Sequence, residues 1–181
     1  MAFQLSLYEQ ARVFDALQDT LSYDQLSPAE RHQFVLNFTF GDEQDPLVWT
    51  ARQADTDAGT ALALYWHLSP AYWSQYASAE EASADVSFAD YQLLKEIEAN
   101  YLAGFYLNRN YSFDPSEFIA EGGAEEPADG NELMRRASPG ARFARQDPEV
   151  VLFAESGLFE GLASGELPTA GLRFSVSALD D

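Results

Sequence analysis

The sequence contains no cysteine and no long hydrophobic run, and Lys95 is its only lysine. The lack of cysteine excludes disulfides and thiolate metal sites, and it fits a reducing compartment. No apolar stretch approaches the roughly 20 residues that are needed to cross a bilayer. Residues 1–4 show no basic start followed by an apolar run, which is the pattern of a signal peptide. We therefore expect a cytoplasmic protein that does not bind membranes.

Positive charge is scarce as well, because ten basic residues face thirty acidic ones and the formal net charge is −20. Direct binding to nucleic acid or to an anionic membrane surface is disfavoured, since both need a cationic footprint. A basic protein partner would instead be attracted, and it would associate faster at low salt. The alternative interpretation is that the acidity serves solubility alone, and the sequence leaves both interpretations open.

What the chain has in quantity is apolar and aromatic residues, which make up 46% and 14% of its 181 positions. This composition supports one domain with a core and argues against disorder of the whole chain. We expect the rest of the chain to pack around a helix at 55–68. Asp55 and Asp57 can cap its start, and the run that follows is apolar nearly all round, as in a buried helix. Ser69 and Pro70 should end it, because the residue before a proline avoids the helical region.

Periodicity and capping signals predict the other helices. The first helix covers 5–21 and carries an apolar stripe at three- and four-residue steps. Capping boxes begin two more helices at Ser27 and Ser87, and the second of these is the longest helical pattern of the chain. A short helix is expected from Asp45, and a further helix from Asp147 through Phe159 to an end near Gly161 or Gly165; each aspartate precedes a proline. The predicted stripe of the first helix comprises Leu7, Ala11, Phe14, Leu17 and Leu21.

Strand-like patterns are few: residues 111–113 alternate briefly, and residues 172–176 form either a short strand or a docked tail. We predict an all-α fold, a compact helical bundle of about five to seven helices with a C-terminal extension. The expected division is a helical domain at 1–115, a flexible acidic loop at 116–132, and a C-terminal helical extension at 133–181 packed on the core.

Four segments, LNFTFGD at 36–42, DAGTALALYW at 57–66, GFY at 104–106 and FDP at 113–115, follow one another in a characteristic order. Together they resemble a bacterial family known as domain of unknown function 4274, whose pattern has a D-x-G-T-A-L helix and later G-F-Y and F-D-P motifs. The resemblance covers roughly residues 27–115, and the chain departs from the pattern at Thr39 and Phe40. The resemblance implies no established activity. Some members are similar to small proteins encoded beside bacterial toxins, which implies an immunity role.

Catalytic patterns are missing from the sequence. There is no phosphate-binding glycine loop and no Gly-x-Ser-x-Gly nucleophile elbow. His32 and His67 lie far apart; we expect His32 to be exposed and His67 to be hydrogen-bonded at the end of its helix. Glu96 and Glu98 are two residues apart on a helix and therefore face different directions, which makes them a poor pair for hydrolysis. We expect no catalytic residue, no cofactor and no metal, and hence no enzyme.

Acidic and aromatic residues are the remaining candidates for a site. The carboxylates at 42–45 and 55–57 suit Mg²⁺ or Ca²⁺ chemically, but they lack the spacing of a calcium loop, and we interpret them mainly as caps and turns. Trp66 is expected in the core, whereas Trp73 and Tyr76 follow a proline and are the better candidates for an interface. The predicted partner-binding residues are Asp42, Glu43, Asp45, Asp55, Asp57, Trp73, Tyr76, Glu80, Glu81 and Asp85.

Three functional hypotheses remain open. The leading one is an immunity protein that neutralises a cognate toxin by direct protein–protein contact; a nuclease toxin fits best, because it must be cationic around its substrate. The second is a nucleic-acid mimic that inhibits a DNA-binding protein. The third is a hydrolase that uses carboxylates and a divalent metal. The sequence does not give the oligomeric state or the identity of the partner.

Overall fold

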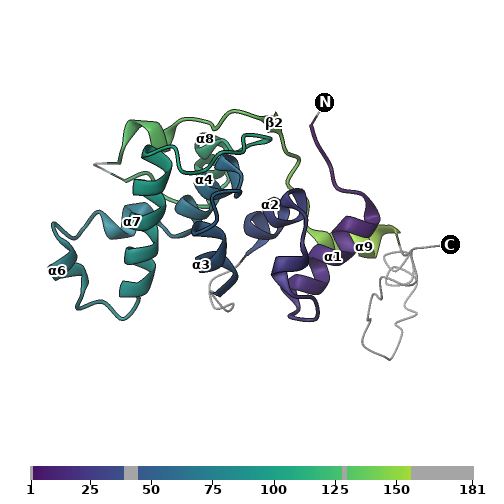
Figure 1. Cartoon of the computed structure of the whole chain (residues 1–181), viewed down its shortest axis with the longest axis horizontal. Helices are drawn as coiled ribbons and strands as arrows, with labels where there is room; N and C mark the ends of the chain where they lie inside the picture. Colours follow the sequence, from purple (N-terminus) through teal and green to yellow (C-terminus); the bar gives the residue numbers. More distant parts are fainter. Residues whose placement is uncertain (1, 39–44, 128–129, 156–181) are drawn as a thin grey trace. The chain divides into compact units, whose positions relative to one another are not determined.

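The structure is a computed structural model that describes residues 2–38, 45–127 and 130–155 (Figure 1). These residues are mostly helical, which confirms the all-α prediction in coarse terms. The exception within the described part is a small two-stranded parallel sheet. The tail at 172–176 lies outside the described residues.

The chain divides into two compact units. We call residues 41–143, with residues 1–2, the central unit, and residues 3–40 and 144–181 the terminal unit. This division differs from the expected one, because the first helices group with the C-terminal segment rather than with the middle of the chain. The central unit carries eighteen acidic and six basic residues, and the terminal unit carries twelve and four.

The central unit consists of short helices and the sheet. Its elements are α3 (Asp45–Ala51), α4 (Ala58–His67), α5 (Pro70–Trp73), α6 (Ala79–Ala82), α7 (Phe88–Leu102), β1 (Tyr111–Ser112), α8 (Pro115–Ala120), η2 (Glu132–Arg135) and β2 (Ala141–Arg142). Figure 1 shows α7 between α4 and α6, with α6 at the left-hand edge. None of the described helices is long and apolar enough to span a bilayer.

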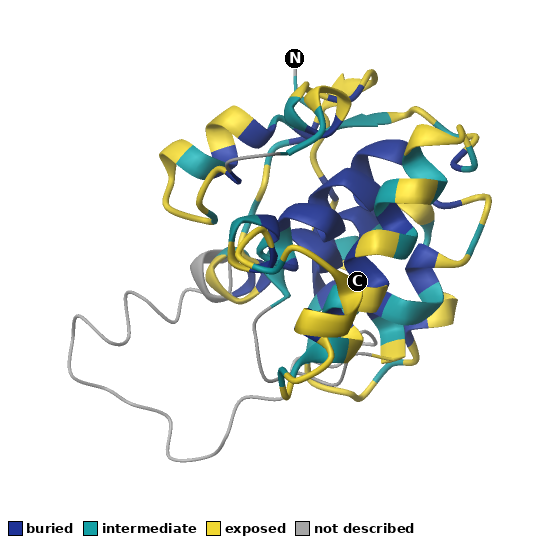
Figure 2. Cartoon of the chain, turned by 90° about the vertical axis from the view of Figure 1, so that its left-hand side faces the viewer, coloured by how far each residue is buried: buried dark blue, intermediate teal, exposed yellow. Residues whose placement is uncertain are grey.

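Helix α4 is the core of the central unit, as the sequence predicted. Every residue from Ala58 to Trp66 is buried, and Figure 2 shows buried helical segments in dark blue. The neighbouring α3, α7 and β1 all contact the helix. The helix ends at His67, and Ser69 then takes a left-handed conformation, with φ of 55°, before Pro70 begins α5. A helix that is apolar on all sides has no solvent face, so its neighbours must cover it completely.

Asp57 fixes the start of α4 to a distant part of the chain. One carboxylate oxygen accepts from the Gly59 amide at 2.9 Å, which is the N-cap bond. The carboxylate also accepts from the amides of Asn110 at 2.5 Å and Tyr111 at 3.4 Å. The carbonyl of Tyr111 lies so close to Gly59 that a Cβ there would collide with it. These contacts explain why the D-x-G part of the motif needs these two residues.

The sheet pairs two segments that are distant in sequence. Tyr111 is aligned with Ala141 and Ser112 with Arg142, in parallel. The extended character of 111–113 was predicted, but its partner strand was not. Helix α8 was not predicted either, and it occupies part of the segment expected to be a loop. Asp114 caps it by accepting from the Ser116 amide at 2.9 Å, ahead of Pro115 at the first helical position.

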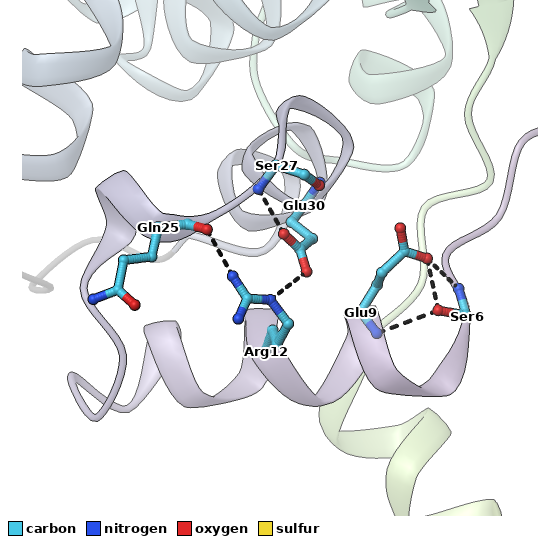
Figure 3. Close-up of polar contacts among 6 residues, drawn as sticks. All are labelled: Ser6, Glu9, Arg12, Gln25, Ser27 and Glu30. Atoms are coloured by element: carbon cyan, nitrogen blue, oxygen red, sulfur yellow. Dashed lines mark hydrogen bonds and ion pairs between the residues drawn. The ribbon is translucent and has the colours of Figure 1, made fainter. Parts of the chain in front are cut away.

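The terminal unit contains α1 (Leu7–Leu17), η1 (Tyr23–Gln25), α2 (Pro28–Asn37) and α9 (Pro148–Glu155), and α1 packs on both α2 and α9. Two capping boxes, Ser6 with Glu9 and Ser27 with Glu30, begin α1 and α2 (Figure 3). The predicted box at Ser27 is therefore confirmed. Arg12 joins the two helices: it donates to the Glu30 carboxylate at 2.8 Å and to the Gln25 carbonyl at 2.6 Å.

Three predictions about the helices are wrong. The first helix is shorter than 5–21 and its buried face is rotated: Gln10, Ala11, Val13 and Ala16 are buried, whereas Leu7 is 38% exposed. His32 was expected at the surface but is fully buried in α2. Ser87 precedes α7 without a side-chain capping bond; its carbonyl, not its hydroxyl, accepts from the Asp90 amide.

Candidate partner-binding surface

Helix α5 folds an aromatic segment back over the core of the central unit. Trp73 is 5% exposed, and its indole N–H donates to the Leu68 carbonyl at 3.0 Å. Tyr72, the preceding residue, is 48% exposed. The ring centroids of Trp73 and Tyr76 are 5.9 Å apart, and those of Trp73 and Tyr91 are 5.6 Å apart. Trp73 is therefore the buried base of a cluster whose other rings reach toward solvent.

Asp85 holds this aromatic segment to the loop before α7. Its Oδ2 accepts from the hydroxyls of Tyr72 and Tyr76, the latter at 2.8 Å, and its Oδ1 accepts from the Ser87 amide at 2.8 Å. The Tyr72 hydrogen bond, followed by those from Ser87 and Tyr76, lowers the pKa of Asp85. The hydrogen bond to Asp85 also raises the pKa of Tyr76, so the phenol stays neutral at physiological pH.

Helix α6 presents carboxylates beside this cluster. Glu80 and Glu81 lie in its first turn and are exposed, and the Glu81 carboxylate accepts from the Ala77 amide at 2.9 Å. No lysine or arginine occurs in the sequence between Arg52 and Lys95. Within the described residues, neither glutamate forms an ion pair. Val86, which follows Asp85, is fully exposed.

Three of the six basic residues of the central unit pair with carboxylates on other elements. Arg52 pairs with Glu96 at 3.0 Å, Arg136 with Glu132 at 3.2 Å, and Arg142 with Glu117 at 2.9 Å. These cations neutralise carboxylates on elements other than α6. Glu80 and Glu81, in the first turn of α6, therefore remain part of the acidic surplus of the unit. We call the exposed residues Tyr72, Glu80, Glu81 and Val86, with Tyr76 and Asp85, the α5–α6 surface.

The structure sorts the predicted partner-binding residues into groups. Asp57 and Trp73 are buried at 2% and 5% exposure, so Asp57 is a structural residue and Trp73 is the base of the aromatic cluster rather than an exposed anchor. Asp45 and Asp55 are exposed, but they belong to the starts of α3 and α4 rather than to the α5–α6 surface. Asp42 and Glu43 lie outside the described residues. Four predicted residues, Tyr76, Glu80, Glu81 and Asp85, come together on one surface.

A cavity of about 410 Å³ adjoins this surface. Trp73, Tyr76 and Tyr91 contribute aromatic side chains to its lining, and Lys95 and Glu98 contribute charged ones. Lys95 donates to the Glu98 carboxylate at 3.0 Å, and its Nζ lies 5.9 Å from the centroid of the Tyr91 ring. Sequence analysis missed the α7 residues, although their spacing of four and then three residues places them on one face of a helix.

Tyr65 on α4 lines the same cavity. Burial raises the pKa of its phenol, with a further contribution from Glu98, so this hydroxyl also stays neutral at physiological pH. The cavity lining therefore includes the neutral phenols of Tyr65 and Tyr76, the side chain of Tyr91 and one ion pair, and no unpaired cation is contributed by its lining residues.

The other candidate chemistry has structural explanations. The described residues contain no group of three or more side chains that could hold a metal ion. Burial lowers the pKa of His32 to about 3, and the ring of His67 lies 4.9 Å from that of Phe118. Glu96 and Glu98 pair with different cations, Arg52 and Lys95, on different sides of α7.

The comparisons with known proteins give a family match over part of the chain. Residues 26–102 match the model of the family described as Domain of unknown function (DUF4274). This is the family that the motifs indicated, so the resemblance is confirmed, although the G-F-Y and F-D-P motifs lie beyond the matched stretch. The match extends from the start of α2 to the end of α7 and so includes α4 and the α5–α6 surface. Neither a curated protein nor a solved structure matches the chain.

Proposed function

We propose that the chain is an acidic binding protein that acts in the bacterial cytoplasm and neutralises a basic protein toxin by direct contact, as an immunity protein does. The observation that carries this proposal is the α5–α6 surface. It exposes Glu80 and Glu81 in a stretch without lysine or arginine, beside the exposed side chains of Tyr72 and Val86. Aromatic anchors with a charged rim are the usual composition of a specific interface.

The charge of the central unit supports the same partner class. Opposite charge on the two proteins accelerates their encounter and excludes partners of like charge. A nuclease toxin would provide the complementary surface, because it needs cations to hold its substrate. Binding over that surface would neutralise the toxin without any chemical reaction by this chain.

The test begins with the neighbouring gene. The chain and the product of an adjacent toxin-like gene should co-purify, and the chain should protect cells that produce the toxin. Its association rate should fall as ionic strength rises, because salt screens the attraction. Absence of a stable complex together with absence of protection would overturn the proposal. Binding to many unrelated DNA-binding proteins would favour a nucleic-acid mimic instead.

A pair of matched variants localises the contact. Glu80→Gln with Glu81→Gln removes two charges from the α5–α6 surface, while a glutamine oxygen can still accept from the Ala77 amide. Glu125→Gln with Glu149→Gln removes two exposed charges elsewhere. We expect the first pair to weaken toxin binding about tenfold and the control pair to leave it nearly unchanged. Equal effects would show that only the net charge matters.

A further inference from the structure

The cavity beside the α5–α6 surface has lining that suits one kind of side chain. Trp73 and Tyr91 lie edge to face, with ring centroids 5.6 Å apart, and Tyr76 adds a third aromatic side chain. Aromatic rings carry negative charge on their faces and attract cations, with tryptophan the strongest of the three. The volume of about 410 Å³ is large enough for a whole side chain with accompanying water.

The lining already contains one ion pair, and its exposure suggests exchange with another cation. The Lys95 side chain is 51% exposed, whereas the Glu98 side chain is 18% exposed. Exposed lysine–carboxylate pairs contribute little stability and are readily exchanged with water. The better-buried Glu98 carboxylate therefore remains at the cavity as a potential acceptor when Lys95 turns into solvent. Arg135, another basic residue of this unit, is bound elsewhere: it donates to the Pro127 carbonyl at 2.6 Å and pairs with the Glu126 carboxylate at 3.5 Å.

We propose that this cavity receives an arginine side chain of the basic protein partner. The inference rests on the function proposed above and specifies its contact. The guanidinium stacks on the aromatic lining and replaces Lys95 as the donor to Glu98, while the carboxylates of the α5–α6 surface attract the neighbouring basic residues. Charge complementarity selects this occupant, because the unit has a threefold excess of acidic over basic residues.

Arginine fits this site better than lysine. Its planar guanidinium is weakly hydrated, stacks on aromatic rings and can give two parallel hydrogen bonds to one carboxylate. A lysine ammonium is more strongly hydrated and would gain only what Lys95 already has at Glu98. The two neutral phenols, Tyr65 and Tyr76, offer hydroxyl oxygens that can accept further donors of the guanidinium.

The first test uses small probes and the full chain. The blocked peptide Gly-Arg-Gly is titrated against the same peptide with citrulline, which has the shape of arginine without its charge. Binding is followed by NMR at the indole N–H of Trp73, whose hydrogen bond to Leu68 gives it a fixed environment. We expect the arginine peptide to bind about tenfold more tightly than the citrulline peptide. Equal binding, or no shift of the Trp73 signal, would overturn the inference.

Two variants separate a cationic occupant from an anionic one. Lys95→Met removes a competing cation, so it should strengthen binding of the arginine peptide, and Glu98→Gln should weaken it about tenfold. If the cavity took an anion, Lys95→Met would abolish binding of a Gly-Glu-Gly peptide and Glu98→Gln would strengthen it. Arg52→Met and Glu96→Gln are matched controls, because this pair is also exposed and contacts α7 but does not line the cavity.

The outcomes keep the two proposals distinguishable. Protection against a toxin without peptide binding would overturn the arginine site and leave the immunity function standing. Peptide binding with the expected response to the variants, but no toxin complex, would support the arginine site and overturn the immunity function.

Discussion

The two units of this chain bury different kinds of polar groups. Among the described residues of the central unit, the buried polar side chains carry hydroxyl or carboxyl groups, such as Asp57 and Thr60 at the start of α4. The terminal unit also buries amides and an imidazole within its helices: Gln10 in α1, and His32 and Gln33 in α2, are all fully buried. A core built on apolar periodicity can be recognised in a sequence, whereas a core that includes amides and a histidine cannot.

The amides of the terminal unit have a shared partner. The Gln10 side chain donates to the Gln146 side chain at 2.8 Å, and the Asn37 side chain donates to the Gln146 carbonyl at 2.9 Å. Gln33 donates to the same carbonyl. These bonds tie the segment before α9 to the α1–α2 pair. Buried hydrogen bonds of this kind specify one arrangement, because any alternative leaves amide groups unpaired.

The largest loss of stability should come from the apolar core of the central unit. Trp66 is 1% exposed, and its indole N–H donates to the Met134 carbonyl at 2.8 Å. We expect Trp66→Ala to lower the free energy of unfolding by about 4 kcal/mol, because it leaves a cavity and an unpaired carbonyl. Urea denaturation followed by the remaining tryptophans measures it, since all three tryptophans lie in this unit. Val86→Ala, at a fully exposed position, is the control and should cause no measurable change.

A smaller loss is expected where a polar group supports that core. Asp57→Ala removes the acceptor of the Gly59 and Asn110 amides and should cost about 3 kcal/mol. Asp57→Asn should cost less, because its side-chain oxygen can still accept from Gly59. Asp55→Ala, two residues earlier and exposed, is the matched control. Equal losses at both positions would contradict the structural role of Asp57.

The stability of the terminal unit should fall in mild acid, because this unit buries His32. The described part of the central unit has no fully buried histidine. Burial lowers the pKa of His32 to about 3 from an ordinary value of 6.5, so the unfolded chain takes up a proton that the folded chain excludes. The resulting stability is complete above pH 6.5 and is lost as pH falls toward 3. Between pH 7 and pH 5 we expect a loss of about 2 kcal/mol.

Far-ultraviolet circular dichroism during urea denaturation, at both pH values, measures this effect. His32→Leu removes the titrating group and should remove that part of the pH dependence. The difference between the two proteins isolates the histidine from the carboxylates, which titrate in both. An NMR pKa for His32 near 6.5 would contradict its burial.

The smallest stability losses are expected from two ion pairs, one in each unit, and the more buried pair should give the larger loss. Arg12 is 20% exposed and Glu30 only 3%, so Arg12→Ala leaves a buried carboxylate without its cation and should cost about 1.5 kcal/mol. Arg52 and Glu96 are 58% and 35% exposed, and Arg52→Ala should cause no measurable change in stability. Chemical denaturation of both variants compares them directly, and a larger loss at Arg52 would contradict this difference.

Four residues of the candidate surface were predicted from the sequence, because they lie close together in one short stretch of the chain. Glu80 and Glu81 belong to an acidic stretch without basic residues, and Tyr76 follows the proline that begins α5. The cavity was missed, because Tyr65 comes from α4 and Tyr91 from α7. Only packing brings these residues together, and no spacing along the chain links them.

The sequence alone determined where several helices begin and that α4 is buried. A capping box at Ser27 or an aspartate before a glycine at Asp57 acts within three residues, so the signal and the structure lie in the same short stretch. Tertiary structure alone decided which face of α1 is buried, which strand pairs with β1 and what else Asp57 binds. In those cases the partner lies far along the chain, as with Gln10 and Gln146, which are 136 residues apart. Such contacts depend on the packing of whole elements rather than on any local pattern.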